Sequence, residues 1–153
     1  MRLVREQQRA LITLINNAGE HATHRVTIRR LRGLERGSTD YSLARIAQHL
    51  AMSNRDIALT IRALVRDEDP PMDMVITNGK PSDDAQPDHA LAELHNSIAD
   101  LERALGELNA VRGATRTHPH PWFGALSASV WACVPSYHQA VHLKQAGLVA
   151  ARL

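Results

Sequence analysis

Aromatic residues are scarce in this chain of 153 residues, which contains 2 Trp, 2 Tyr and 1 Phe. Runs of β-branched residues are also few, so a core must be built from Leu, Ile, Val and Ala carried on helices. A chain of this length makes about one domain, or one small domain with an appendage, and is long enough to bury a core. The sequence therefore predicts a mainly α protein.

Cysteine and long apolar runs are the other absences. Cys133 is the single cysteine, so an internal disulfide is excluded and a reducing compartment is expected. The N-terminus places Arg2, Arg5 and Arg9 among polar residues, which does not fit a signal peptide. The longest weakly polar run, 123–134, is shorter than the roughly 20 residues that a membrane-spanning helix needs. We expect a cytoplasmic protein without a membrane partner.

Charge of either sign is nearly balanced overall but unevenly distributed. The net charge of +2 divides into +7 for residues 1–66, −9 for 67–108 and +4 for 109–153. Such segregation is expected when one part of a protein faces phosphates and another part is kept away from them. The alternative is that the charged blocks are only solvated faces.

The most informative stretch runs from Ser42 to Arg66. Its apolar residues recur at helical spacing in two groups, which are Leu43, Ile46, Ala47 and Leu50, then Ile57, Ile61, Leu64 and Val65. The four residues between the groups, 51–54, are predicted to form a tight corner. Ser53 and Asp56 form a Ser-x-x-Asp pattern that caps the start of a second helix. Two short amphipathic helices joined in this way form a helix-turn-helix.

This stretch resembles the large helix-turn-helix family of DNA-binding regulators. Ala47 matches the family's small residue on the first helix, and Ala51 stands where the family most often has Gly. The family's buried positions on the second helix are matched by Ile57, Ile61 and Leu64. The resemblance implies that the second helix enters the major groove of duplex DNA. The residues expected to face the DNA are Ser53, Asn54, Arg55, Leu59 and Arg62.

Two segments precede the central stretch. Residues 2–17 carry one apolar helical face and end before Gly19, which predicts a supporting helix. Residues 23–36 fit either a strand or a helix, and the helix is favoured. Arginines are dense there, and we expect them to contact phosphates. They are Arg25, Arg29, Arg30, Arg32 and Arg36.

The composition changes after Arg66. Residues 72–77 fit a short strand, and Asn78-Gly79 favours a tight turn, as in the wing of a winged helix-turn-helix. The residues that follow are poor strand formers, so the sequence does not predict a complete wing. Three parts are predicted: a DNA-binding domain (1–79), a flexible acidic linker (80–88) and a helical oligomerisation or interaction segment (89–153).

A regular apolar pattern begins after the linker. Steps of three and four residues, typical of a coiled coil, connect Leu91, Leu94, Ile98, Leu101, Leu105 and Leu108. We expect a homodimer through this helix, and the alternative is a helix that folds back on its own domain. After a hinge at 112–121, residues 122–153 end in an amphipathic helix from Ser136 to Leu153. That segment either packs on the core or binds a protein partner.

Histidine is abundant, with nine residues. His118, His120, His138 and His142 with Cys133 invite a zinc hypothesis, and the last two histidines stand four apart on one helix face. However, no paired cysteines accompany them and the His-Pro-His-Pro stretch does not make its rings converge. We therefore predict no metal ligand and no cofactor. The sequence also has no Gly-rich phosphate loop, Gly-x-Ser-x-Gly elbow or His-Glu-x-x-His, which argues against an enzyme.

The function that this sequence favours is sequence-specific binding of double-stranded DNA by a homodimeric transcriptional regulator. Two alternatives stay open. One is a structural nucleoprotein component that packages or partitions DNA. The other is a protein-interaction or inhibitor module on a helix-turn-helix scaffold.

Overall fold

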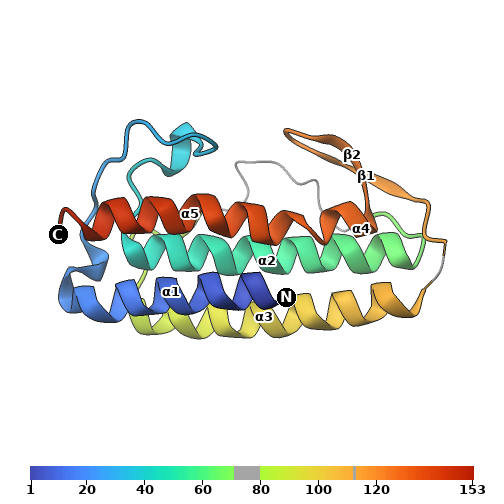
Figure 1. Cartoon of the computed structure of the whole chain (residues 1–153), viewed down its shortest axis with the longest axis horizontal. Helices are drawn as coiled ribbons and strands as arrows, with labels where there is room; N and C mark the ends of the chain where they lie inside the picture. The colour runs from blue at the N-terminus through green and yellow to red at the C-terminus, as the bar shows by residue number, and fades with distance from the viewer. Residues whose placement is uncertain (71–79, 112) are drawn as a thin grey trace.

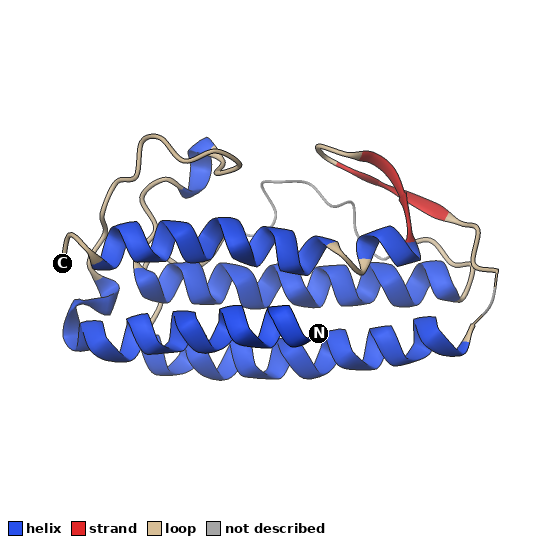
Figure 2. Cartoon of the chain, viewed as in Figure 1, coloured by secondary structure: helices blue, strands red, loops and turns tan. Residues whose placement is uncertain are grey.

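Four long helices run side by side in this computed structural model, which describes residues 1–70, 80–111 and 113–153 (Figures 1 and 2). They are α1 (Arg2–Ala18), α2 (Leu43–Val65), α3 (Pro87–Ala110) and α5 (Val134–Ala150). A short helix, α4 (Ala128–Trp131), precedes α5, and single 3-10 turns form at Gly19–Thr23 and Arg36–Ser38. Strands β1 (Thr117–His120) and β2 (Gly124–Ser127) form an antiparallel hairpin in which His120 pairs with Gly124. The mainly α prediction is confirmed.

Helix α2 is continuous through the predicted corner. It runs from Leu43 to Val65 without a break, so the two short helices predicted from the sequence are not present. Ser42 caps this helix by accepting a hydrogen bond from the backbone N–H of Arg45. The residues of the expected corner include neither Gly nor Pro, and packing along the whole apolar face stabilises one long helix. The helix-turn-helix prediction is wrong for this stretch.

Two apolar clusters fill the bundle, and each takes residues from both sides of the predicted linker. One contains Leu11, Leu43, Leu94 and Val149. The other contains Val4, Ile61, Leu101 and Trp131. The described parts of the two predicted domains, 1–70 and 89–153 without residue 112, therefore contribute to one bundle and do not form separate domains.

The apolar stripe of α3 packs within its own chain. Leu94, Ile98 and Leu101 are buried. The partly buried members of the stripe, which pack on the same two clusters, are Leu91, Leu105 and Leu108. Helix α2 is the main neighbour of α3. Helix α3 therefore folds back on its own domain, which was the alternative prediction. Its apolar stripe is not available as the seam of the predicted coiled coil.

The oppositely charged blocks of the sequence meet at the interface between α2 and α3. Ion pairs there join Arg55 to Glu93 at 3.2 Å, Arg62 to Glu107 at 2.7 Å and Arg66 to Glu107 at 3.1 Å. Each such partly exposed pair contributes only about 0–1 kcal/mol. Part of the uneven charge distribution along the sequence therefore reflects ion pairs between two neighbouring helices.

The segments before α2 agree with the prediction in one case only. Helix α1 ends at Gly19, where a φ of 53° suits glycine, as the sequence predicts. Residues 24–35 form a loop instead of the predicted helix, because the buried Ile28 pairs its backbone N–H with Thr39 O at 2.7 Å. The predicted wing strand and turn at 72–79 lie outside the described residues. None of the described helices combines the length and apolar character that crossing a bilayer requires.

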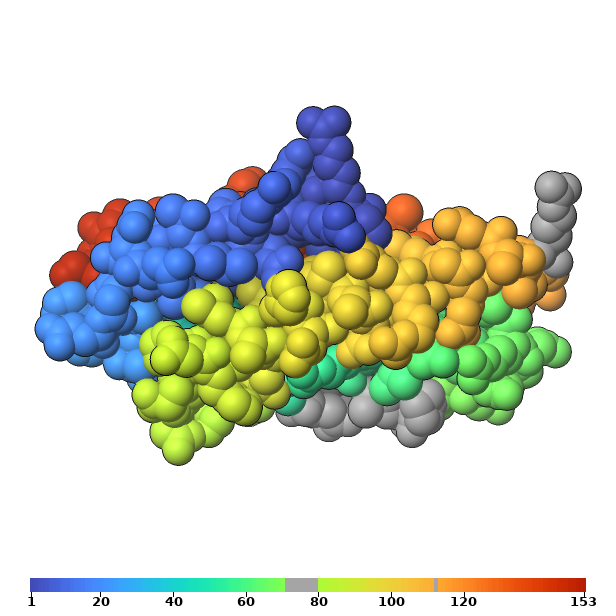
Figure 3. Space-filling view, turned by 90° about the horizontal axis from the view of Figure 1, so that it is seen from below, coloured from blue at the N-terminus to red at the C-terminus, as the bar shows by residue number. Residues whose placement is uncertain are grey.

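Helix α1 has 17 residues against the 24 of α3 and leaves part of α3 uncovered (Figure 3). A cavity of about 240 Å³ lies at its N-terminal end, with Met1, Val4, Leu101 and Cys133 among its lining residues.

Candidate metal centre

Three histidine side chains from two helices meet on one side of the bundle. His49 comes from α2, while His138 and His142 stand one turn apart on α5. Their candidate ligand nitrogens lie within 4.8 Å of one another, and Nε2 of His49 is 3.2 Å from Nε2 of His138. The ring centroids are 4.7 to 5.0 Å apart in edge-on arrangements. The three imidazoles therefore converge.

This convergence fits a divalent transition-metal ion. Zinc–nitrogen bonds of about 2.0–2.1 Å in a tetrahedral site place neighbouring ligand nitrogens roughly 3.3 Å apart. The 3.2 Å between His49 and His138 agrees with that spacing. Imidazole suits zinc, copper, nickel and iron. Three protein ligands leave a position for an outside molecule, as in catalytic zinc sites and unlike closed structural ones.

Gln145 fixes the tautomer of His142. The amide NH₂ of Gln145 donates to the backbone carbonyl of Ser38 at 2.6 Å, so its Oε1 faces Nδ1 of His142 at 2.8 Å. An amide oxygen only accepts, so Nδ1 carries the proton and Nε2 presents its lone pair to the centre. Outer partners of this kind orient metal-binding histidines. Ser38, His142 and Gln145 are all buried, so water does not compete for these hydrogen bonds.

Burial keeps two of the three imidazoles neutral. It is the main cause that lowers the pKa of His142 to about 3, followed by the nearby His49, and the Gln145 hydrogen bond acts in the opposite direction. Burial also lowers the pKa of His138 well below its usual range, followed by His142, His49 and His120. Metal ions bind the neutral form of imidazole. At neutral pH these two ligands therefore need not release a proton.

The comparisons with known proteins concern the fold. No family model matches the chain, and no curated protein matches it. A solved structure described as "Crystal structure of TT2238, a four-helix bundle protein" matches with a TM-score of 0.61 and 22% identity, over 94% of this chain and 91% of that one. The chain has the fold of a four-helix bundle. At this identity the likeness shows the fold alone.

A buried amide network joins three of the four long helices, α2, α3 and α5. Nδ2 of Asn54 donates to Oγ of Ser97 at 3.1 Å, and Nε2 of Gln139 donates to Oδ1 of Asn54 at 3.3 Å. Gln139 directly follows His138 on α5. Its hydrogen bond to Asn54 therefore fixes the position of α5 along α2 close to that histidine. All three amide or hydroxyl side chains are at most 1% exposed.

The residues predicted to read DNA are used mainly within the bundle. Asn54 is fully buried, and Arg55 and Arg62 are half-buried in ion pairs with α3. Ser53 is half-buried, whereas Leu59 is exposed. The structure therefore does not assemble the predicted reading surface.

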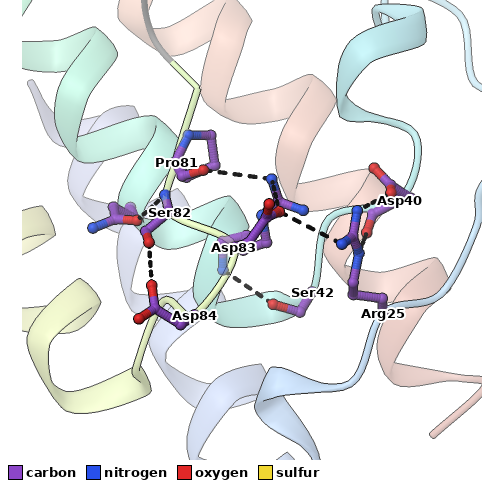
Figure 4. A network of polar contacts seen from close by, with 9 residues as sticks. Arg25, Asp40, Ser42, Pro81, Ser82, Asp83 and Asp84 are labelled. Atoms are coloured by element: carbon purple, nitrogen blue, oxygen red, sulfur yellow. Dashed lines mark hydrogen bonds and ion pairs between the residues drawn. The ribbon is translucent and has the colours of Figure 1, made fainter.

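The predicted phosphate-binding arginines divide into two groups. Arg25 joins a polar cluster in which it binds the carboxylate of Asp40 and lies 3.5 Å from Asp83 (Figure 4). The buried Arg45 also binds Asp83, at 3.0 Å, so the predicted flexible linker is tied to the start of α2. The remaining four are exposed and have no ion pair in the parts of the chain that the structure describes. These are Arg29, Arg30, Arg32 and Arg36.

The centre combines ligands that the sequence revealed and one that it did not. His138 and His142 stand out by their spacing, but His49 lies 89 positions before His138 in a stretch assigned to DNA binding. His118 and His120, which the zinc hypothesis included, lie on β1 outside the three-histidine group, and Cys133 is exposed elsewhere. The sequence does place Gln145 three residues after His142, on the same helix face, but its burial and its contact with His142 are known only from the structure.

Proposed function

We propose that this four-helix bundle binds one divalent transition-metal ion, with zinc as the first candidate, through His49, His138 and His142. The observation that carries the proposal is the convergence of three imidazoles, one of which has its tautomer fixed by Gln145. This proposal departs from the sequence-based prediction of no metal ligand. His49 and His138 each keep part of their surface exposed, so we expect a small molecule to reach the ion from their side. Such an ion acts as a Lewis acid on an oxygen or sulfur atom that binds it.

Zinc titration of the chelator-treated protein tests this proposal. Calorimetry and elemental analysis should give one ion per chain, and His142→Ala should weaken binding by more than about 100-fold, since even loss of an outer partner weakens it 10–100-fold. His95→Ala, which changes an exposed histidine of α3, is the matched control and should bind like the wild type. Equal affinity of the wild type and His142→Ala would overturn the proposal.

Duplex DNA binding is a second candidate, and one observation supports it. Arg29 and Arg30 are exposed in the loop before α2 and form no ion pair with any other described residue. Without a reading helix, we expect contact with phosphates only, which is independent of sequence. The double variant Arg29→Ala/Arg30→Ala should weaken binding to every duplex alike and flatten the salt dependence by about 0.9 per lost contact. Unchanged affinity in an electrophoretic mobility assay would contradict this candidate.

A further inference from the structure

One of the few aromatic residues of this chain contacts the candidate metal centre, and the other four form a group beside the start of α5. Tyr41 meets the ring of His49 edge-on at 5.6 Å. The other four belong to a group built on His120 of β1. Ring contacts in this group join His120 to Trp122 at 6.3 Å, to Phe123 at 4.7 Å and to Trp131 at 5.1 Å, and Phe123 to Tyr137 at 5.8 Å. Tyr137 directly precedes the ligand His138.

Three of these rings are not needed to fill the core. Trp122, Phe123 and Tyr137 are 45%, 50% and 48% exposed, whereas Trp131 and Tyr41 are buried. Large aromatic side chains usually gain stability by burial, and neighbouring exposed ones mark a surface that binds something. Because the three are joined through Phe123 and His120, they form one surface, which we call the aromatic face.

The hairpin holds the aromatic face in position. Its tip, between β1 and β2, carries Trp122 and Phe123 and lies over α5 (Figure 1). The backbone N–H of Trp122 donates to Nδ1 of His120 at 3.1 Å, which fixes the tip. The indole N–H of the buried Trp131 donates to the carbonyl of His118 at 3.3 Å and anchors β1. The tip is thus fastened beside the ligand-bearing turn of α5.

We infer that the aromatic face binds the flat ring of a small molecule whose polar head occupies the open position of the metal centre. The inference rests on the proposed function. It assigns the ligand to one chemical class, an aromatic or heteroaromatic compound with an oxygen or sulfur donor. Small-molecule sites combine apolar and aromatic walls with a few polar anchors, and aromatic rings pair at centroid distances of 4.5–7 Å. Phe123 and Tyr137 provide the wall, and the metal ion provides the anchor.

A pair of hydroxamates tests this inference on the zinc-loaded protein. Acetohydroxamate and benzohydroxamate carry the same metal-binding head, and only the second has a ring. An aromatic contact should make benzohydroxamate bind about 2- to 13-fold more tightly. Phe123→Ala and Trp122→Ala should reduce that preference without changing the affinity for acetohydroxamate. Leu59→Ala, which removes an exposed apolar side chain on α2, is the matched control and should keep the preference.

Each outcome has a distinct meaning. Equal affinity for the two hydroxamates overturns the inference, and so does a preference that persists in both aromatic variants. Failure of the wild type to take up zinc overturns the proposed function instead. Zinc content and far-ultraviolet circular dichroism after each titration show that a variant is folded and loaded. Phe123→Leu, which keeps apolar bulk without the ring, should also lose the preference and replaces Phe123→Ala where the latter does not fold.

Discussion

Lowering the pH from 7 to 5 should destabilise the metal-free protein by about 2 kcal/mol through His142 alone. The pKa of this buried imidazole is about 3 in the folded chain and 6.5 at its ordinary value. Between these values the unfolded chain binds a proton that the folded chain does not, so stability falls as the pH falls. Each pH unit below 6.5 costs about 1.36 kcal/mol, and pH 5 lies roughly 1.5 units below it. The lowered pKa of His138 acts in the same direction.

Urea unfolding followed by circular dichroism, at pH 7, 6 and 5 with a chelator present, measures this loss. His142→Gln removes the titrating imidazole. Between pH 7 and pH 5 the variant should therefore lose about 2 kcal/mol less free energy of unfolding than the wild type. His95→Gln, at an exposed position of α3, should retain the wild-type pH dependence. Parallel curves for the wild type and His142→Gln would refute the buried, neutral imidazole.

Three further substitutions probe the site and the packing. Gln145→Leu removes the acceptor that orients His142 and should lower zinc affinity about 10- to 100-fold in the same titration. Asn54→Ala leaves the buried amide NH₂ of Gln139 without its acceptor and removes the donor to Ser97 Oγ, which keeps its own bond to the Leu94 carbonyl. The change should cost about 1–3 kcal/mol in urea unfolding, and a loss below about 0.5 kcal/mol would contradict the network. Ile98→Asp with Leu101→Asp puts charges into the core and should abolish helical circular dichroism, whereas a folded monomer would support the coiled-coil interpretation.

Local patterns predicted the helical class and most long helices. The helix expected at 2–17 is observed at Arg2–Ala18, because one apolar face and the stop at Gly19 are both local signals. The helix expected after residue 88 begins at Pro87, and the last helix begins at Val134 instead of Ser136. The loop at 24–35 was misjudged because its apolar residues have helical spacing but pack individually on the core.

The misinterpretation of α2 has one physical source. Its buried seam steps by three or four residues from Leu43 through Leu50 to Ile57 and Leu64, with the polar Asn54 at one seam position. A polar residue inside an apolar pattern indicates a corner when its neighbours in space are unknown. The partners that satisfy its amide come from α3 and α5, which no local pattern includes. His49 was missed for the same reason, because it meets His138 and His142 only once α2 packs on α5.

The division of the proposed ligands between α2 and α5 would also affect when a chain can take up a metal ion during its synthesis. His49 precedes the other two ligands by about ninety residues, so a nascent chain that has not yet reached α5 carries at most one of the three. Domains generally fold as their chains emerge from the ribosome, N-terminal parts first. An ion that binds only the native state raises its stability with concentration. Metal uptake would thus distinguish finished bundles from incomplete chains, and stalled or truncated products would stay unloaded and more readily degraded.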